Sequence, residues 1–337
     1  MARGYHVAIA GATGAVGGVM REILEERRFP IASLRLLASE RSAGSTVTFK
    51  GEPLRVEVLT ERSFEGIDVA LFSCGGERSK AFAPAAVRAG AVVIDNSSAF
   101  RMDPRVPLVV PEINAHALAG HEGIVAVPNC TTIVMLMALK PLYDLSRVTR
   151  VVATSFQAAS GAGAKAMAEL EAQLRGWAEG REVPASVFPY PLAFNVIPHI
   201  DAFLPNGYTK EEMKLVNETR KILGDPEIRV TATTVRVPVL RAHAVSVNAE
   251  TERKVTPDEA RAAFARFPGL LVNDDPAELR YPMPRDVAGK DECVVGRIRE
   301  DESHPRALNF FVVGDQLRKG AALDAVQIAE ALVERGL

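Results

Sequence analysis

Cys130 has the sequence setting of a catalytic thiol. It follows a strand-like run at Ile124–Val127 and a proline, and it precedes a strongly apolar helical run at Ile133–Leu139. A thiolate at a helix N-terminus is favoured by the helix dipole and by the free N–H groups of the first turn. The sequence therefore indicates a nucleophile at Cys130, and a buried structural cysteine is the alternative.

A thiol nucleophile needs an acid–base partner, and the segment Arg236–His243 offers one. An alternating strand pattern across this segment predicts that Arg241 and His243 share one face while Arg236 lies on the other. A bend at Pro238 would shift that parity. None of the six histidines has metal-ligand spacing to another His or Cys, so we predict no metal site.

Three more charged residues have positions suited to an ionic substrate. A capping box of Thr209 with Glu212 opens a predicted helix that runs to Gly224. Glu211 and Lys214 are three residues apart on this helix, so they share one face. A solvent-exposed ion pair is the alternative for these two. Arg101 lies near the end of a predicted parallel strand, where doubly wound folds bind ligands, and a surface arginine is the alternative there.

A glycine-rich loop follows the first predicted strand and opens the first predicted helix. It reads Gly11-Ala-Thr-Gly14-Ala-Val-Gly17. Glycines let the backbone approach a pyrophosphate, and the helix N-terminus supplies N–H groups and a favourable dipole. The context indicates a dinucleotide site, but the spacing is GxxGxxG rather than GxGxxG, so a ligand-free tight turn is the alternative.

The end of the second predicted strand bears on the choice of nicotinamide cofactor. NAD-specific proteins usually place an acid there, on the ribose 2′-OH. Arg41 and Ser42 instead suit a 2′-phosphate, although Glu40 precedes them. The segment favours NADP over NAD, and a solvated surface loop is the alternative.

Two kinds of secondary-structure pattern must position these residues. Short apolar runs alternate with helical segments over the first 127 residues, which indicates a Rossmann-like, doubly wound α/β domain. Longer alternating strands follow, such as Arg229–Val237 and Ala244–Glu250. They predict an α+β domain with a largely antiparallel sheet.

The composition excludes several classes of protein. The 337 residues include 40 Lys and Arg against 42 Asp and Glu, so a polycationic nucleic-acid binder is excluded. No apolar run is long enough to span a membrane. The three cysteines are far apart in the sequence, which argues against a disulfide framework and for a reducing, cytoplasmic compartment.

Seven motifs, in order along essentially the whole chain, resemble those of the aspartate-β-semialdehyde dehydrogenases. They are Gly11-Ala-Thr-Gly-Ala-Val-Gly17, Asp95-Asn-Ser-Ser-Ala-Phe-Arg101, Pro128-Asn-Cys130-Thr, Gln157 with Ser160-Gly-Ala-Gly163, Glu211-Glu-Met-Lys214, Arg236 through His243, and Asp315-Gln-Leu-Arg-Lys-Gly-Ala-Ala322. One motif could arise by accident, but seven in the right order would not. The resemblance favours the functional reading of Cys130.

The resemblance implies both a domain organisation and an assembly. Residues 1–127 and 318–337 would form an NADP-binding domain, because the C-terminal helix returns to it. Residues 128–317 would form a catalytic and dimerisation domain. The chain would be a homodimer built through this second domain, and some members of the family pair dimers into tetramers.

The resemblance also assigns roles to individual residues. Cys130 would form an acyl-thioester, His243 would be the general acid/base, and Gln157 would orient the substrate. Arg101, Lys214 and Asn129 would bind the phosphate of the substrate. Arg236 would bind its α-carboxylate, and Glu211 would bind its α-ammonium. NADP would contact Gly11, Thr13, Gly14, Ala15, Val16, Arg41, Ser42, Ser160, Gly161 and Gln316.

The implied reaction is the NADPH-dependent conversion of β-aspartyl phosphate to aspartate semialdehyde and phosphate, in lysine, methionine and threonine biosynthesis. The charges of this substrate match the residue set one for one. One rival is an N-acetyl-γ-glutamyl-phosphate reductase, whose substrate has no ammonium to pair with Glu211. The other is a non-catalytic nucleotide-binding paralogue, which would be expected to lose Cys130 or His243.

Three places depart from the family pattern. One is the strand Thr154-Ser-Phe-Gln157, where an aromatic residue two before the glutamine is common although the residues vary. Thr131 stands where Ser is usual, which is a conservative change. Gln316 stands where Asn is usual, and this puts the implied nicotinamide contact at Gln316 in question.

Overall fold

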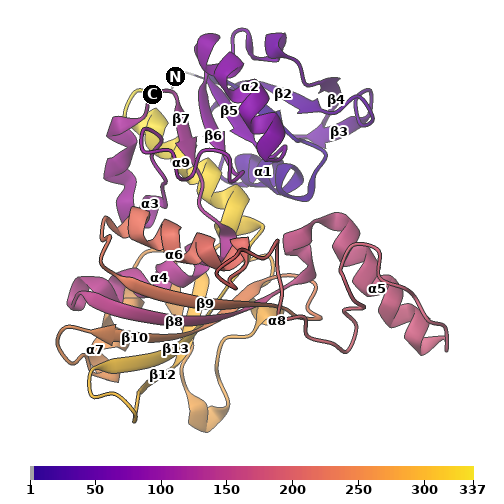
Figure 1. Ribbon diagram of the computed structural model, residues 1–337. Helices are drawn as coiled ribbons and strands as arrows, with labels where there is room; N and C mark the ends of the chain where they lie inside the picture. The colour runs from indigo at the N-terminus through magenta and orange to yellow at the C-terminus, as the bar shows by residue number, and fades with distance from the viewer. Residues whose placement is uncertain (1–3) are drawn as a thin grey trace. The chain divides into compact units, whose positions relative to one another are not determined.

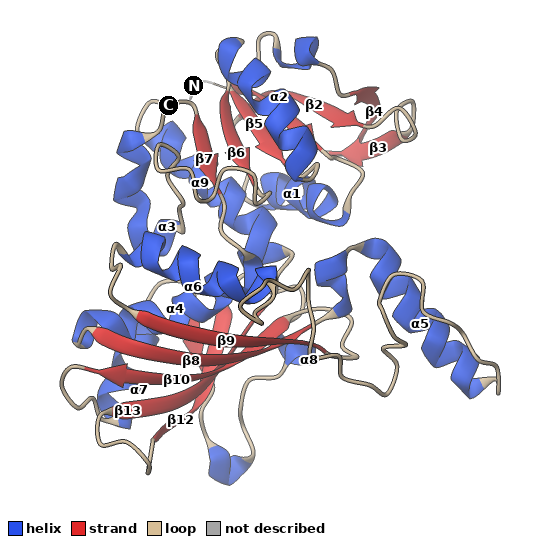
Figure 2. Ribbon diagram, viewed as in Figure 1, coloured by secondary structure: helices blue, strands red, loops and turns tan. Residues whose placement is uncertain are grey.

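The computed structural model describes residues 4–337, and the chain divides into two compact units. The first contains Met1–Asn129 and Ala321–Leu337, and the second contains Cys130–Gly320. Each unit is built on its own sheet (Figures 1 and 2). The predicted combination of a doubly wound domain with an α+β domain is confirmed.

The first unit contains a seven-stranded sheet in the order β3-β4-β2-β1-β5-β6-β7. Every pairing is parallel except that of β3 with β4. The strands are β1 (Tyr5–Ala10), β2 (Ile31–Ala38), β3 (Thr46–Phe49), β4 (Glu52–Val58), β5 (Val69–Phe72), β6 (Val92–Asp95) and β7 (Ile124–Ala126). The helices are α1 (Ala15–Glu26), α2 (Gly76–Arg88), α3 (Pro111–Asn114) and α9 (Leu323–Glu334).

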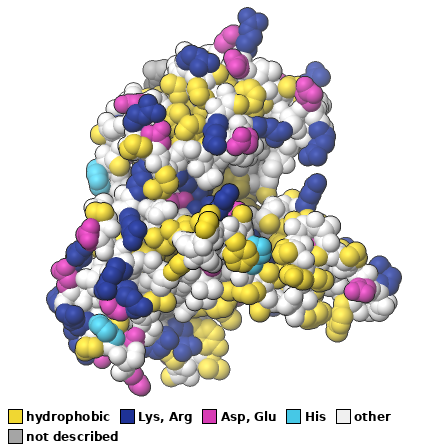
Figure 3. Space-filling view, in the orientation of Figure 1, with side chains coloured by type: hydrophobic (Ala, Val, Ile, Leu, Met, Phe, Trp, Pro, Cys, Tyr) yellow, Lys and Arg dark blue, Asp and Glu magenta, His cyan; other side chains and the backbone are white. Residues whose placement is uncertain are grey.

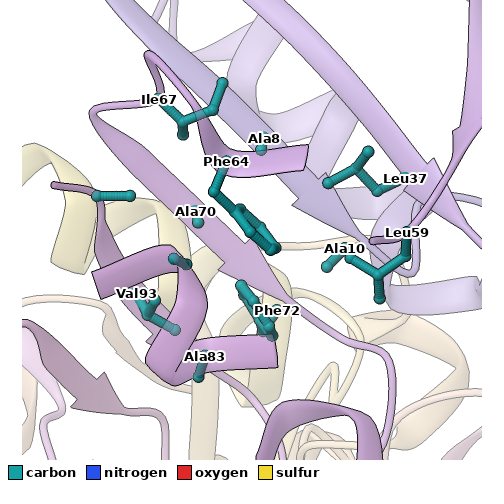
Figure 4. Packing of buried hydrophobic residues seen from close by; sticks show 12 residues of the cluster. Ala8, Ala10, Leu37, Leu59, Phe64, Ile67, Ala70, Phe72, Ala83 and Val93 are labelled. Atoms are coloured by element: carbon teal, nitrogen blue, oxygen red, sulfur yellow. The ribbon is translucent and has the colours of Figure 1, made fainter. Parts of the chain in front are cut away.

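Apolar residues on both faces of the central strands hold this sheet in place. Figure 4 shows one such cluster, in which the rings of Phe64 and Phe72 stack with centroids 5.4 Å apart. The C-terminal helix α9 packs on α1, α3 and β6. A bidentate ion pair from Arg27 to Glu330 fixes it further. The first unit is therefore completed by the last residues of the chain.

The second unit contains a six-stranded sheet in the order β11-β12-β13-β10-β8-β9. The three middle pairings are antiparallel, and the outer pairs β11–β12 and β8–β9 are parallel. The strands are β8 (Val148–Gln157), β9 (Arg229–Arg236), β10 (His243–Thr251), β11 (Leu270–Val272), β12 (Cys293–Glu300) and β13 (Ala307–Gly314). The helices are α4 (Cys130–Leu145), α5 (Ala164–Ala178), α6 (Lys210–Leu223), α7 (Pro257–Arg266) and α8 (Pro284–Val287).

Helix α6 has the start and the end that the sequence predicts. The Thr209 hydroxyl accepts from the Glu212 N–H, and the Glu212 carboxylate accepts from the Thr209 N–H. Gly224 closes the helix with a φ of 64°. The other Glu212 oxygen accepts from the Thr234 N–H, 3.0 Å away, so the capping residue also anchors α6 to β9.

Candidate active site

The sheet of the second unit brings three predicted site residues to one edge. Gln157 ends β8 and Arg236 ends β9, and these two residues are in register because the strands are parallel. His243 begins β10, which runs antiparallel to β8 and pairs its next residue, Ala244, with Phe156. Figure 1 shows the three strands side by side. The topology alone therefore places an amide, a guanidinium and an imidazole together.

The peptide groups of Ala158 connect two of these side chains. Its N–H donates to His243 Nδ1 over 3.1 Å, and its carbonyl accepts from Arg236 Nη1 over 2.6 Å. Gly161 leaves room beside them, because a Cβ there would stand 3.0 Å from Arg236 Nη1 and 3.1 Å from His243 Nε2. A side chain at position 161 would therefore crowd both Arg236 and His243.

Helix α6 adds an acid and a cation to this edge. Glu211 is buried, which rules out the solvent-exposed ion pair considered from sequence. Its Oε1 accepts from Gln157 Nε2 over 3.2 Å, and its Oε2 accepts from Lys214 Nζ over 2.8 Å. Lys214 also donates to Asp201 over 3.0 Å. Burial lowers the pKa of Lys214, but the attraction of Glu211 and Asp201 outweighs this effect, and the net pKa is raised.

Ser155 is a residue of this network to which sequence reasoning gave no role. Its fully buried hydroxyl donates to Gln157 Oε1 over 2.9 Å. The amide of Gln157 is thereby oriented with its oxygen toward Ser155 and its nitrogen toward Glu211. The alternation of β8 places residues 155 and 157 on the same face, which is the signal that would have found Ser155.

Cys130 is the first residue of the 16-residue helix α4. The N–H groups of its first turn lack partners within the helix, and the positive end of the dipole lies there. Gly320 packs against Cys130, since a Cβ at Gly320 would lie 2.9 Å from the Cys130 Cβ. Thr131, where the family usually has Ser, is fully buried.

The charges of the site act on one another. Burial lowers the pKa of Arg236, while the attraction of Glu211 and of the Cys130 thiolate opposes that effect. Burial and the positive charge of Arg236 lower the pKa of His243 to about 3, with Glu211 opposing them. Arg236 therefore interacts electrostatically with the carboxylate of Glu211, the thiolate of Cys130 and the imidazole of His243.

The predicted strand pattern across Arg236–His243 is wrong. The chain leaves β9 after Arg236 and enters β10 only at His243, and Ala242 between them has a φ of 73°. The Gln316 side chain holds this turn, because its Oε1 accepts from the Ala242 N–H over 2.9 Å and its Nε2 donates to Ser160 Oγ. Arg241 does not share a face with His243 in a strand but pairs with the fully buried Asp315 at 2.6 Å.

Gln316 therefore has a structural role in this chain. It joins the loop that precedes His243 to the segment that contains Ser160 and Gly161. The longer side chain, which stands where the family usually has Asn, fits this bridging position.

The remaining predicted residues belong to the first unit. Arg101 is buried rather than on the surface, and it donates to the carbonyls of Val127 and Asn96 at 2.9 Å each. Asn129, which precedes Cys130 in the chain, is also buried.

The glycine-rich loop has the geometry of a dinucleotide turn. Gly11 has a φ of 93°, and a Cβ there would lie 2.3 Å from the Ser73 carbonyl oxygen, so only glycine fits. Thr13 and Gly14 complete the turn, and helix α1 then begins at Ala15, followed by Val16. The unpaired N–H groups at the start of this 12-residue helix suit a pyrophosphate.

A cavity of about 500 Å³ lies in the first unit at the end of β2. Its lining includes Arg41, as the sequence suggests, and also Glu40, but not Ser42. Arg78 from α2 supplies a second guanidinium that sequence reasoning missed. The remaining lining residues are Ser39, Val58, Leu59 and Phe82.

Two features are absent from residues 4–337. Within this range no group of His, Cys, Asp and Glu side chains is arranged to hold a metal ion. No helix in the same range has the length and apolar character needed to cross a membrane.

Comparisons with known proteins place this site in a family. The family model for the semialdehyde dehydrogenase NAD binding domain matches residues 6–121, and that for the semialdehyde dehydrogenase dimerisation domain matches residues 139–319. The aspartate-semialdehyde dehydrogenase of Aquifex aeolicus is 53% identical over 99% of both chains, and that of Bacillus subtilis is 47% identical over all of both. The chain belongs to the aspartate-semialdehyde dehydrogenase family. It is an oxidoreductase.

Solved structures of the family agree with this assignment. The aspartate semialdehyde dehydrogenase II of Vibrio cholerae superposes with a TM-score of 0.96 at 47% identity, covering 98% of this chain and 99% of that one. The same enzyme in complex with ASA also gives a TM-score of 0.96, with 99% of both chains covered.

Proposed function

We propose that the chain catalyses the reversible, NADPH-dependent conversion of β-aspartyl phosphate to aspartate semialdehyde and phosphate. The observation that carries this proposal is the buried Glu211, hydrogen-bonded to Gln157 and Lys214 at the same sheet edge as Arg236. A buried carboxylate beside a guanidinium fits a substrate that carries both an ammonium and a carboxylate. An N-acetylated substrate would offer that carboxylate no ammonium to pair with, so the N-acetyl-γ-glutamyl-phosphate reductase alternative is not favoured.

Substrate recognition divides by charge in this proposal. Arg236 binds the α-carboxylate and Glu211 binds the α-ammonium. Lys214, Arg101 and Asn129 bind the phosphate. Lys214 donates to the carboxylates of Glu211 and Asp201 in the structure. Binding of a phosphate by Lys214 would therefore break its hydrogen bond to Asp201.

Cys130 is the nucleophile of the proposed reaction. Its thiolate attacks the acyl carbon, the C–S bond forms and phosphate leaves. Gln157 orients the acyl group, and His243 contacts the oxygen of that group. When bound, NADPH supplies the hydride that reduces the acyl-thioester. The thiol must stay reduced for this chemistry, which fits a cytoplasmic enzyme with three free cysteines.

The first unit fits NADP. The Gly11 turn and the start of α1 suit the pyrophosphate, and the two guanidiniums at the cavity beyond β2 suit a 2′-phosphate. Thr13, Gly14, Ala15 and Val16 would provide the loop contacts, and Arg41, with Ser42 beside it, would select the phosphate. Ser160, Gly161 and Gln316 would lie toward the nicotinamide.

Replacing Arg41 by alanine is expected to raise the KM for NADP by roughly 10–100-fold, because one charge-assisted hydrogen bond contributes about 1.5–3 kcal/mol. The KM for NAD should change by less than a factor of about three. Steady-state kinetics with each cofactor measures the ratio. Arg62→Ala is the matched control, since Arg62 is an exposed arginine of the same unit that pairs with Glu65 in a surface contact. An equal loss for NAD and NADP would contradict the role of Arg41.

The assay that tests the proposed function follows reduced nicotinamide by absorbance. Purified protein is mixed with aspartate semialdehyde, phosphate and NADP, and N-acetylglutamate semialdehyde is run alongside. We expect NADPH formation that requires phosphate and occurs only with the first substrate. Activity with the acetylated substrate alone would assign the chain to the rival reductase. Absence of activity with retained NADP binding would indicate the non-catalytic paralogue.

We also propose that the chain forms a homodimer through the second unit. Exposed large apolar side chains gather on α5 and on the segment after it (Figure 3). Trp177 is 67% exposed and its ring lies 4.8 Å from that of Phe194, which is 66% exposed. Tyr190, Val196 and Phe203 are each at least 60% exposed. So much aromatic surface is typical of a protein interface rather than of a free surface.

This surface is held in shape by one buried acid. Glu169 of α5 accepts from the N–H groups of residues 186, 187 and 188 and from the Ser186 hydroxyl. Burial raises the pKa of Glu169, but these hydrogen bonds outweigh it and the net pKa is lowered, so the acid is ionised. The segment that carries Tyr190 and Phe194 is thus fixed on α5 before any partner binds. Pairing of such dimers into a tetramer would require a second surface.

Replacing Trp177 by arginine is expected to weaken dimerisation by about 30-fold or more, since buried tryptophans commonly contribute 2 kcal/mol or more to an interface. Sedimentation velocity across a concentration series measures the dissociation constant. Leu279→Arg, at a side chain that is 73% exposed elsewhere in the same unit, is the control and should remain dimeric. Equal behaviour of the two variants would place the interface elsewhere.

A further inference from the structure

One acidic side chain at the site has no counterpart among the charges of the proposed substrate. Asp201 accepts from Lys214 Nζ over 3.0 Å, and Glu211 accepts from the same nitrogen over 2.8 Å. In the proposed function Glu211 pairs with the α-ammonium and Lys214 binds the phosphate, which leaves the charge of Asp201 unmatched. One ammonium between two carboxylates has a net negative charge around it, and phosphate is itself an anion. The carboxylate of Asp201 therefore opposes the binding of phosphate at Lys214.

The segment that carries Asp201 lies between two anchors. At one end, Ile197 exchanges two backbone hydrogen bonds with Arg236, the last residue of β9, over 2.9 and 2.8 Å. At the other end, the Ala202 carbonyl accepts from the N–H of Lys210, the first residue of α6, over 2.8 Å. The backbone therefore holds Asp201 close to the end of β9 and to the first turn of α6, where the substrate would bind.

The local backbone directs the Asp201 carboxylate. Asp201 has a φ of 68°, in the left-handed region that aspartate and asparagine adopt more readily than most other residues with a side chain. Its Oδ1 accepts from the Ala202 N–H over 2.8 Å, and its Oδ2 accepts from Lys214. Burial raises the pKa of Asp201, but these two hydrogen bonds outweigh it and the net pKa is lowered. The acid is therefore ionised where it contacts Lys214.

The two acids differ in how firmly they hold Lys214. Glu211 lies on the same helix and its side chain is 7% exposed, whereas the side chain of Asp201 is 36% exposed and lies outside any helix or strand. The more exposed pair is the weaker one, because water screens it. Lys214 can therefore stay in place through Glu211 while Asp201 moves away. The positive charge of Lys210 also attracts Asp201 and would stabilise the released carboxylate.

We propose that Asp201 is an internal competitor of phosphate. Its carboxylate occupies Lys214 when phosphate is absent, gives up this contact when phosphate binds, and regains it as phosphate leaves. Phosphate is a product in the biosynthetic direction, so the return of Asp201 to Lys214 favours product release. This inference rests on the proposed function, in which Lys214 binds the phosphate.

Asp201→Asn tests the competition because it removes the charge and preserves the shape of the side chain. Asparagine tolerates the same φ, and its side-chain oxygen can still accept from the Ala202 N–H. We expect the KM for phosphate to fall by roughly three- to tenfold, since breaking a partly exposed ion pair and removing one nearby charge each change an affinity by up to about fivefold. Steady-state kinetics over a range of phosphate concentrations measures this change.

The other kinetic constants show whether the effect is specific to phosphate. The KM for aspartate semialdehyde, which carries no phosphate, and kcat should each change by less than about twofold. An unchanged KM for phosphate in Asp201→Asn would overturn the proposal. A raised KM for phosphate would also overturn it, because Asp201 would then position Lys214 for phosphate rather than compete with it.

Asp144→Asn is the matched control. Asp144 pairs with Lys140 on α4, so this change removes the same charge from another lysine–aspartate pair of the same unit. The KM for phosphate should stay within about 1.5-fold of the wild-type value, since the screened effect of a distant surface charge is small. A fall equal to that in Asp201→Asn would attribute the effect to net charge and would overturn the proposal.

A titration of inorganic phosphate followed by ³¹P NMR measures binding without turnover. We expect the dissociation constant to fall in Asp201→Asn by the same factor as the KM. When Lys214→Met is combined with Asp201→Asn, most of this gain should disappear, because the cation for which the two anions compete is gone. An equal gain with and without Lys214 would overturn the proposal. Failure of the proposed function itself would instead appear as wild-type protein without phosphate-dependent turnover.

Discussion

Cys130→Ala is expected to lose phosphate-dependent turnover by at least about 10⁴-fold, because removing a nucleophile leaves no covalent route to the acyl intermediate. The same absorbance assay measures this loss. Wild-type protein given aspartate semialdehyde and NADP without phosphate should accumulate an acyl group on the peptide that contains Cys130, and mass spectrometry detects it. The variant should show no such adduct.

Cys74→Ser is the matched control for this experiment. Cys74 is partly buried, and burial raises the pKa of its thiol, so it is poorly suited to be a nucleophile. It should retain activity within about twofold and should carry no acyl group. Turnover in Cys130→Ala close to that of the control would remove Cys130 from the mechanism.

Arg236→Met is expected to lower kcat/KM for aspartate semialdehyde by roughly 10²–10⁴-fold. The guanidinium is buried, and two charge-assisted hydrogen bonds to a carboxylate contribute about 1.5–3 kcal/mol each. Arg236→Lys should recover only part of the loss, since an ammonium lacks the planar fork. Both variants would be measured by steady-state kinetics over a range of semialdehyde concentrations.

Arg229→Met supplies the comparison on the same strand. Arg229 begins β9 and its side chain is 67% exposed, so its replacement should leave kcat/KM within about twofold. If Arg236→Met behaved like Arg229→Met, Arg236 would not bind the substrate carboxylate. Arg236→Met has a second consequence, because loss of the neighbouring positive charge removes one cause of the lowered pKa of His243.

Local patterns were enough to predict the features that depend on short stretches of chain. The capping box at Thr209 with Glu212 and the closing Gly224 fixed the bounds of α6 from sequence. Cys130 was expected at the start of a helix because of the strand, proline and apolar run around it, and α4 does begin there. Gly11 was expected in a tight turn and has the positive φ that such turns require.

Contacts between distant segments could not be predicted in the same way. The spacing of Glu211 and Lys214 places them on one face of a helix, but only the packing of α6 on β9 shows that Glu211 is buried. The segment before His243 reads as a continuous strand because its apolar residues alternate. Its turn at Ala242 is held by Gln316, which lies 74 residues away in sequence.

Two other features were missed for related reasons. Arg78 lies on a helix whose sequence shows no phosphate-binding signal, and it reaches the cavity only because α2 and the end of β2 are neighbours in the fold. Helix α5 was not predicted. The exposed aromatic side chains on it and on the following segment form one surface only because Glu169 fixes that segment against the helix.

The split of the first unit between the two ends of the chain has a consequence for how the protein is made. Its sheet is encoded by the first 129 residues, but α9, which packs on α1 and β6, is translated only after the whole of the second unit. At ribosomal rates, roughly 10–40 s separate the two. The second unit is continuous and can fold as it emerges, whereas the nucleotide-binding unit must wait with apolar surface uncovered. The nascent chain would therefore depend on chaperones during this interval, and mutations in α9 would reduce the yield of protein before they affected catalysis.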